Sequence, residues 1–454
     1  MTNPPITTEP TTPVADTALP THVAEALPTS VRGPVLLPGD TDWDMGNKPW
    51  NREVDQQVAA VVEAADADDV AALVRFARTH GLAIATQPSG HGATGRATGA
   101  VLLRTGRLDR IDVDPVQQTA RVGAGVRSGD LQRAAAAHGL TALPGSSPVV
   151  TVTGTALGGG LSWFGRAFGW IADSVLAFDV VDADGNARTV NPGSDPELYW
   201  ALRGGGGELA VVTALEVRLH PAPQVFGGRQ LWSADHAHQV AQAFRAMTET
   251  APPGLTLWFE LLNFPGADPM VAIDSTHLGD EATARELMSP TDDLPTPLSD
   301  SRASISVADL GAITGEPTEP SAGRSHAELL TRLDDDVFAT LLDQPLAPVM
   351  AVQLRHLGGA LAGPSDGPHG PLVEPYALYL LGPAPTPELA RAVSARQAEL
   401  VAFLPISGRK PVTFLNPTEE LSDALSPASL ERLRRLKDER DPDRIIRGNF
   451  AVAD

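Results

Sequence analysis

Three glycine-rich segments, each following a strand-like run, constrain this chain more than any other feature. They lie at residues 87–95 (QPSGHGATG), 144–160 and 204–207. Glycines leave backbone N–H groups uncovered, and a pyrophosphate group is bound through such N–H groups. The segments therefore predict strand-to-loop connections that approach a phosphate-bearing ligand closely.

A further glycine-containing stretch, residues 122–129, has the spacing GxGxxxG. The fingerprint of a Rossmann dinucleotide site needs GxGxxG and an acidic residue at a set distance after the following strand. Neither requirement is met here. The sequence thus predicts against a nicotinamide cofactor bound in the Rossmann manner.

Composition limits the class of partner. The chain has 454 residues, of which 42% are hydrophobic, so it is long enough for two or three domains with a sizeable core. Its net charge of −22 argues against nucleic acid and anionic membrane surfaces, since both select basic proteins. There is no apolar run of about 18 residues and no basic region followed by an apolar one at the start. We expect a soluble, cytoplasmic protein, while the oligomeric state stays open.

The chain contains no cysteine. Disulfides, thiolate metal sites and cysteinyl cofactor links are therefore excluded. His236 and His238 form the sequence His-Ala-His, but no third ligand follows at a recognisable spacing, so no metal site is predicted.

The first half of the chain indicates an α+β fold. Residues 1–34 are rich in proline and threonine, which predicts a disordered tail. Apolar residues recur with helical spacing from Asp66 to Gly81, and short strand patterns follow up to residue 222. We take residues 35–222 as one domain.

After residue 222 the segments become longer. Strand-like runs occur at residues 255–262, 349–357 and 376–381, and the polar stretch 289–325 resembles a long loop. Ser426 and Pro427 open a clear helix that Asp441 and Pro442 end. The prediction is a second domain over residues 223–413, built as an antiparallel sheet backed by helices, with residues 414–454 returning to the first domain.

Four motifs in order resemble a known family. They are GHGATG (90–95), PGSSP with ALGGGLSWFGRAFGWIADSV (144–175), ELYWALRGGGGELAVVT (197–213) and LERLRRLKDERDPDRIIRGNF (430–450). Together they resemble the FAD-linked oxidases of the vanillyl-alcohol oxidase superfamily, which have a PCMH-type FAD-binding domain, and specifically the berberine-bridge-enzyme-like branch. The resemblance covers a little under half of the chain.

The resemblance implies FAD, bound covalently through His91 by its 8α-methyl group. Many members add a cysteinyl tether, but Ala172 stands at that position here, so at most one tether is expected. The positions implied to contact the cofactor are Gln87, Pro88, Ser89, Gly90, His91, Gly92, Thr94, Gly95, Pro144, Gly145, Ser146, Val152, Gly154, Gly158, Gly159, Ser162, Trp163, Asp173, Val211 and Asn449.

The catalytic apparatus departs from the family pattern. Gln353 stands where some members carry a glutamate base, and Pro411, Val412 and Thr413 replace a Tyr-x-Asn pair. Glutamine accepts no proton at working pH. The remaining candidates for a base are Tyr376, Glu260, Tyr379 and His356, of which Tyr376 and Glu260 are favoured because their strands are expected to line the pocket.

The resemblance implies an oxidoreductase that takes a hydride from a small organic substrate, expected to be a secondary metabolite, and passes electrons to oxygen. Two alternatives remain at this point. One is a flavin oxygenase or a non-redox cyclase, which Gln353 and the lost Tyr-x-Asn pair favour. The other is a flavin-binding protein without activity.

Overall fold

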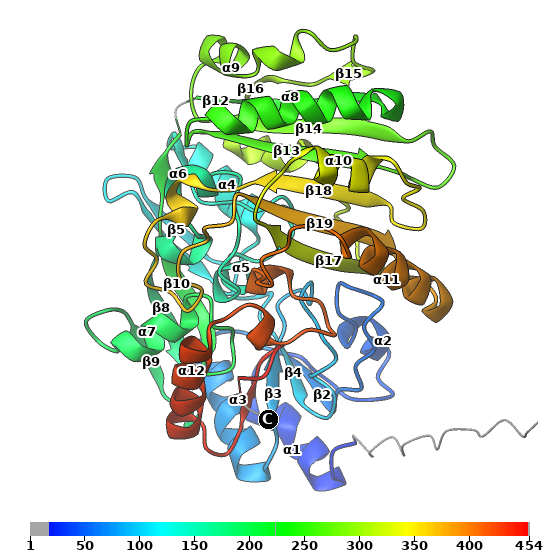
Figure 1. Ribbon diagram of the computed structural model, residues 1–454. Helices are drawn as coiled ribbons and strands as arrows, with labels where there is room; N and C mark the ends of the chain where they lie inside the picture. The colour runs from blue at the N-terminus through cyan, green and yellow to red at the C-terminus, as the bar shows by residue number, and fades with distance from the viewer. Residues whose placement is uncertain (1–17, 223, 453–454) are drawn as a thin grey trace, which may run out of the picture.

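The computed structural model describes residues 18–222 and 224–452. Figure 1 shows two smaller sheets below one large sheet. The first small sheet is parallel except for its first strand. Its strands, in spatial order, are β1 (Val35–Leu36), β2 (Ala60–Glu63), β4 (Val101–Arg104), β3 (Ile84–Thr86) and β20 (Ile446–Arg447). The chain thus returns at its end to a sheet that it began near its start.

The second small sheet is antiparallel. Its order is β5 (Ile111–Asp114), β6 (Thr119–Gly123), β10 (Val211–Arg218), β8 (Val175–Val181) and β9 (Ala187–Val190). A two-stranded pair, β7 (Leu140–Thr141) with β11 (His220–Pro221), stands apart. The helices beside these strands are α4 (Ser128–Ala136), α5 (Val152–Leu157), α6 (Gly165–Phe168), α7 (Pro196–Leu202) and α12 (Pro427–Arg440).

Helix α3 (Ala67–His80) joins the two small sheets. Its apolar residues Val70, Leu73 and Val74 pack in one core with residues of β2, β4, β8 and β10. The Asp66 side chain accepts a hydrogen bond from the Asp69 N–H and opens the helix, and Gly81, with φ of 64°, ends it. Both ends lie where the sequence predicts them.

The large sheet has eight antiparallel strands. They run β15 (Ser299–Asp300), β12 (Val225–Ser233), β14 (Met270–His277), β13 (Leu255–Leu262), β18 (Ala351–His356), β19 (Tyr376–Pro383) and β17 (Gly323–Leu330), with β16 (Ala303–Ile305) also on β12. Helices α8 (Ala237–Thr250), α9 (Glu281–Leu287) and α10 (Asp335–Leu342) pack on one face, while the C-terminal end of α11 (Pro387–Val401) reaches the same core (Figure 1). The opposite face looks toward the first part of the chain.

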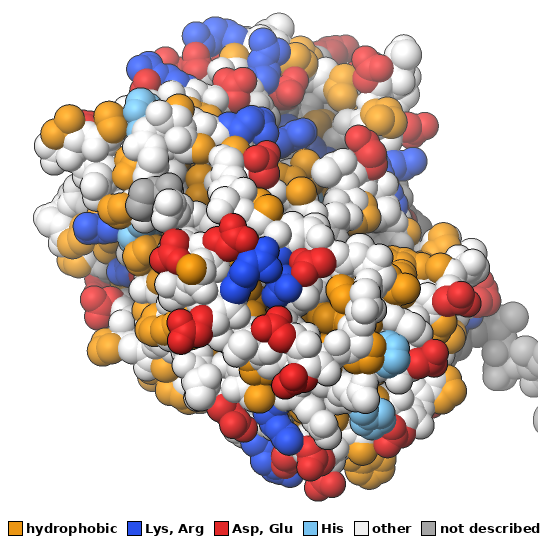
Figure 2. All heavy atoms as spheres, turned by 90° about the horizontal axis from the view of Figure 1, so that it is seen from above, with side chains coloured by type: hydrophobic (Ala, Val, Ile, Leu, Met, Phe, Trp, Pro, Cys, Tyr) orange, Lys and Arg blue, Asp and Glu red, His pale blue; other side chains and the backbone are white. Residues whose placement is uncertain are grey.

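The predicted α+β class is confirmed, including an antiparallel sheet backed by helices. The boundaries at residues 222 and 413 stay predictions. Seen from above, acidic and basic side chains lie interspersed on the surface (Figure 2). No helix within residues 18–222 and 224–452 is long and apolar enough to cross a bilayer.

Two predictions from composition are wrong in part. Within the predicted tail, residues 1–17 lie outside the described part of the chain, but Thr21–Ser30 forms helix α1, which buries Val23 and Leu27 against α3. Within the predicted loop 289–325, β15 and β16 pair with β12, and β17 begins at Gly323. Contacts with distant parts of the chain, which composition does not encode, order both segments.

Candidate active site

His91 lies in the loop that leaves β3, between Gly90 and Gly92. Gly90 has φ of 80°, and a Cβ there would come within 2.8 Å of the Pro49 backbone, so the loop and the chain around Trp50 are in close contact. The His91 ring stacks on Trp50, with centroids 4.2 Å apart and planes at 19°. Its Nδ1 is 2.7 Å from Ser89 Oγ. The loop therefore fixes the ring in both position and orientation.

The other ring nitrogen of His91, Nε2, is buried and has no hydrogen-bond partner in the part of the chain that the structure describes. Burial lowers the pKa of His91 to about 4, and the positive charge of Arg127 adds to this. At neutral pH the ring is thus an uncharged imidazole with one unused nitrogen.

Several other buried polar atoms share that condition; they lie at the end of β3, in the His91 loop, in the chain around Trp50 and in the segment 144–160. Among the described residues, partners are lacking for Trp50 Nε1, Arg52 Nη1, Thr86 Oγ1, Arg96 Nε, Ser147 Oγ and Thr153 Oγ1. Most are donors, and buried donors without acceptors are rare in proteins that have no ligand to bind. A flavin dinucleotide brings a pyrophosphate and ring carbonyls as acceptors. The residues present therefore fit FAD.

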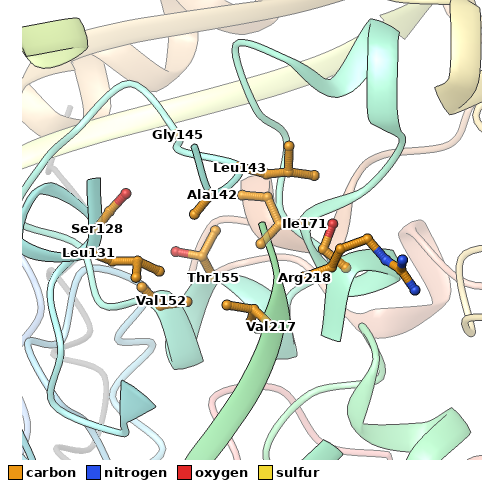
Figure 3. A pocket seen from close by; sticks show the side chains of 11 residues that line it. Ser128, Leu131, Ala142, Leu143, Gly145, Val152, Thr155, Ile171, Val217 and Arg218 are labelled. Atoms are coloured by element: carbon orange, nitrogen blue, oxygen red, sulfur yellow. The ribbon is translucent and has the colours of Figure 1, made fainter. Parts of the chain in front are cut away.

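The segment 144–160 lines a pocket (Figure 3). Its walls come from α4, the loop before α5, α5 itself and the end of β10. The lining residues are Ser128, Leu131, Ala142, Leu143, Gly145, Val152, Thr155, Ile171, Ser174, Val217 and Arg218. Gly145 and Val152, two of the predicted cofactor positions, are among them. His91 does not line this pocket.

The end of the chain reaches the His91 loop through a buried ion pair. Lys437 Nζ, in α12, lies 2.7 Å from Asp441 Oδ2 and also donates to the carbonyls of Glu208 and Ile446. Asp441 in turn accepts the N–H groups of Ile445 and Ile446. This turn directs β20 to β3 and brings Asn449 to the loop, where its carbonyl accepts the Thr94 hydroxyl.

Other predicted cofactor positions have partners within the protein. Asp173 pairs with Arg203 at 2.7 Å and accepts Ser365 Oγ at 3.0 Å. Val211 is buried in the core around α3. The Trp163 ring stacks on Trp258 of β13, with centroids 3.7 Å apart, so it touches the large sheet. The role of each position in cofactor binding stays a prediction.

The face of the large sheet opposite the helices carries a buried polar network. Arg229 binds Asp274 through two hydrogen bonds of 2.6 and 2.7 Å and also binds Glu260 at 2.7 Å. Gln353 donates to the other Glu260 oxygen at 2.7 Å and accepts two hydrogen bonds from Arg355. Both oxygens of Glu260 are therefore bonded within the network. Burial, and next the Asp274 charge, raise the pKa of Glu260 well above its usual range.

Tyr379 lies on the same face, opposite Gln353 in the register of β18 and β19. Its ring is 5.2 Å from that of Phe414, and burial raises the pKa of its hydroxyl. The register of the three strands thus brings Glu260, Gln353 and Tyr379 to one surface.

The preference for Tyr376 needs correction. Its hydroxyl lies 2.7 Å from Thr248 Oγ1 of α8, and its ring packs in the core between sheet and helices. His356, its cross-strand neighbour, contacts Arg166 Nη1 at 2.9 Å, and burial lowers the pKa of His356 to about 3. Successive side chains of a strand alternate between faces, so neither residue shares a pocket with Glu260.

Several residues at the site escaped sequence reasoning. Trp50, Arg229 and Asp274 carry no motif, and each meets its partner from another part of the chain. His369 is buried against two glycine segments, where a Cβ on Gly204 would lie 2.4 Å from its Nδ1. The glycines signalled a close approach, but not what approaches. His238, which the sequence analysis considered as a metal ligand, has its Nε2 2.7 Å from Asp343 Oδ1.

Comparisons with known proteins identify a domain family and a relative that spans most of the chain. Residues 58–191 match the family model described as "FAD binding domain". The chain is 29% identical over 462 residues to (R)-6-hydroxynicotine oxidase of Paenarthrobacter nicotinovorans, covering 94% of this chain and 98% of the relative.

Solved structures extend the match over the whole fold. The crystal structure of 6-hydroxy-D-nicotine oxidase from Arthrobacter nicotinovorans has a TM-score of 0.81 at 27% identity, covering 94% of this chain and 99% of that one. BBE-like 1 of Physcomitrella patens reaches 0.83 at 18% identity, covering 95% and 99%, which bears on the fold alone. The chain is therefore an FAD-dependent oxidoreductase that is homologous to (R)-6-hydroxynicotine oxidase over nearly its whole length and shares its fold with a BBE-like protein.

Proposed function

We propose that this protein is an oxidase that carries FAD on Nε2 of His91 and oxidises a small organic substrate, with oxygen as the electron acceptor. The observation that carries the proposal is the buried, unpartnered Nε2 of a ring already fixed by Trp50 and Ser89. When bound, FAD supplies the chemistry that takes a hydride from the substrate and returns the electrons to oxygen.

The protein's own part at His91 is to hold a nucleophilic nitrogen. A bond from Nε2 to the 8α-methyl carbon would replace a C–H bond there and release two electrons and two protons, which oxygen would take up. It would require a neutral imidazole whose proton sits on Nδ1. Burial supports the neutral form, because it lowers the pKa of His91 to about 4. Ser89 Oγ, 2.7 Å from Nδ1, supports the tautomer by accepting the Nδ1–H bond. The same contacts would keep the attached ring from turning.

We place the substrate on the face of the large sheet that carries the buried polar network, which we call the network face. Trp258 of this face contacts Trp163, so the network face adjoins the glycine segments; we call this contact region the junction. On it, Tyr379 is the side chain that we assign to the reacting group of the substrate, because Gln353 accepts no proton and both oxygens of Glu260 are bonded within the network. A hydroxyl within hydrogen-bond reach of the substrate would orient it.

The relatives' names bear on the substrate only as a class. One acts on 6-hydroxynicotine and another on chitooligosaccharides, so the proposal extends no further than a small organic molecule, with a secondary metabolite as the expectation from the sequence. Neither the non-redox cyclase nor the inactive flavin binder is favoured by these comparisons. The cytoplasmic location stays a prediction.

The attachment is tested by acid precipitation. We expect the flavin of the wild-type protein to remain in the pellet, and His91→Ala to release it into the supernatant. His22→Ala, at an exposed histidine of α1, is the matched control and should keep the flavin bound. Complete loss of flavin from the wild-type pellet would refute the covalent bond.

A digest tests the number of tethers. Because the chain has no cysteine, mass spectrometry should find flavin on one peptide only, the one that contains His91. Flavin on a peptide spanning residues 158–175 would contradict a single histidyl tether.

A further inference from the structure

Arg355 is a buried cation without an anionic partner. It lies in β18 with 6% of its surface exposed. Its Nε and Nη2 donate to Gln353 Oε1 at 3.1 and 2.7 Å. No carboxylate of residues 18–222 or 224–452 pairs with it within 4.0 Å, and Nη1 makes no hydrogen bond to these residues. Because buried charges in proteins are nearly always paired, we expect this guanidinium to bind an anion.

The two nearest carboxyl groups of the network are already committed. Asp274 holds Arg229 with both oxygens. Glu260 bonds to Arg229 with one oxygen and to Gln353 with the other. Gln353, a neutral amide, separates Glu260 from Arg355. The network thus gives Arg229 direct contacts with two carboxyl groups and gives Arg355 none.

Aromatic rings surround the guanidinium. Its Cζ lies 4.0 Å from the ring centroid of Trp258, 5.0 Å from that of Phe414 and 5.5 Å from that of Tyr379. Such contacts favour the charged state and hold the guanidinium plane in place. An anion bound here would meet a rigid, desolvated donor.

The same spot adjoins the glycine segments. Trp258 stacks on Trp163, whose Nε1 is buried with no partner among the described residues. The two side chains that flank the junction therefore offer unused donors, Arg355 Nη1 and Trp163 Nε1. A site of unused donors between aromatic rings suits a ligand that combines acceptor oxygens with a planar apolar body.

We propose that Arg355 binds a carboxylate group of the substrate, so that the protein acts on aromatic or similarly planar carboxylic acids. This inference rests on the proposed function, because it places the substrate beside the flavin. Glu316 is the carboxylate whose charge acts most on Arg355, although no ion pair forms. Removing Glu316 should therefore strengthen the binding of an anion.

The test uses the flavin-containing protein and three probes of similar shape: benzoate, benzyl alcohol and benzylamine. Binding is followed by the change in the flavin absorption spectrum. We expect benzoate to bind most tightly, Arg355→Met to weaken it at least about tenfold, and Glu316→Gln to tighten it. Arg391→Met, at an arginine of α11 paired only with Glu388, should change nothing.

A second variant covers the case in which Arg355→Met does not fold. Gln353→Glu places a carboxylate against Arg355 within the protein, so it should also weaken benzoate at least about tenfold while leaving benzyl alcohol unchanged. This change is small in volume and gives the guanidinium the partner that it lacks.

The outcomes separate the two proposals. A purified protein that is never yellow would refute the proposed function. A yellow protein that prefers benzyl alcohol or benzylamine to benzoate would overturn this inference alone. So would an Arg355→Met protein that binds benzoate normally but has a changed flavin reduction potential, since the arginine would then serve the flavin.

Discussion

At the scale of single residues, two tyrosines on one strand have opposite surroundings. Tyr379 shares the network face with Gln353, whereas Tyr376 bonds to Thr248 among the helices. The alternation of β19 follows from the sequence, but which face meets the cofactor does not. That choice is made by Trp258, Phe414 and the helices, which lie far away along the chain.

This difference predicts unequal effects of the same substitution. Tyr379→Phe should lower the rate of anaerobic flavin bleaching by a substrate about 10²-fold, as expected for loss of a hydroxyl that positions the reacting group. Tyr376→Phe should leave the rate within a few-fold and cost about 1 kcal/mol of unfolding free energy, because one buried hydrogen bond is lost. Glu260→Gln should also have a small effect on the rate, since both oxygens of Glu260 are bonded within the network and neither is free for the substrate. Equal rate losses in both tyrosine variants would contradict the assignment.

At the scale of elements, the sequence predicted those whose signals are local. The helix α3 begins after Asp66 and ends at Gly81, and α12 begins after Ser426 and ends before Asp441, as their capping residues indicated. Helix α1 was missed because Pro28 and its threonines suggested disorder. Its only helical signal, Val23 and Leu27 four apart, gains meaning through contact with α3.

The same limit applied at the candidate site. The His91 loop was predicted because its glycines and histidine form one continuous motif. The network of Arg229, Asp274 and Glu260 was not, because three separate strands contribute one residue each. Such a cluster exists only in the registered sheet.

The contact between α1 and α3 gives a prediction for an element. Leu27 is fully buried, so Leu27→Ala should lower the free energy of unfolding by about 2–5 kcal/mol. Glu25→Ala, on the exposed side of the same helix, should change it by less than about 0.5 kcal/mol. Urea denaturation measures both. If Leu27→Ala unfolds like the wild type, α1 adds nothing to the core.

At the scale of the whole molecule, the large sheet is joined to the glycine segments by buried polar contacts. Arg166 of α6 donates to the carbonyls of Leu255 and Ala251 and contacts His356. His369 stacks on Trp170, with centroids 4.7 Å apart, and its Nε2 faces the Val412 N–H at 3.4 Å. Two buried histidines, His356 and His369, thus lie at this junction in surroundings that favour a neutral imidazole.

Their pKa values predict how the junction responds to acid. Burial lowers the pKa of His356 and of His369 to about 3, and the charges of Arg166 and Arg409 add to the effect. In the unfolded chain both histidines titrate near 6.5. As the pH falls below 6.5, the unfolded state binds protons that the folded state does not, so stability is full above 6.5 and is lost progressively down to about 3. Each histidine contributes a slope of at most about 1.4 kcal/mol per pH unit.

A variant isolates one of these slopes. His356→Gln keeps an acceptor for Arg166 but cannot titrate, so its free energy of unfolding should fall less steeply than that of the wild type between pH 6.5 and 5. His22→Gln, at an exposed position of α1, should keep the wild-type slope. Urea melts at several pH values give both slopes. Equal slopes in the two variants would contradict this prediction. They would mean that His356 binds its proton as readily in the folded protein as in the unfolded chain.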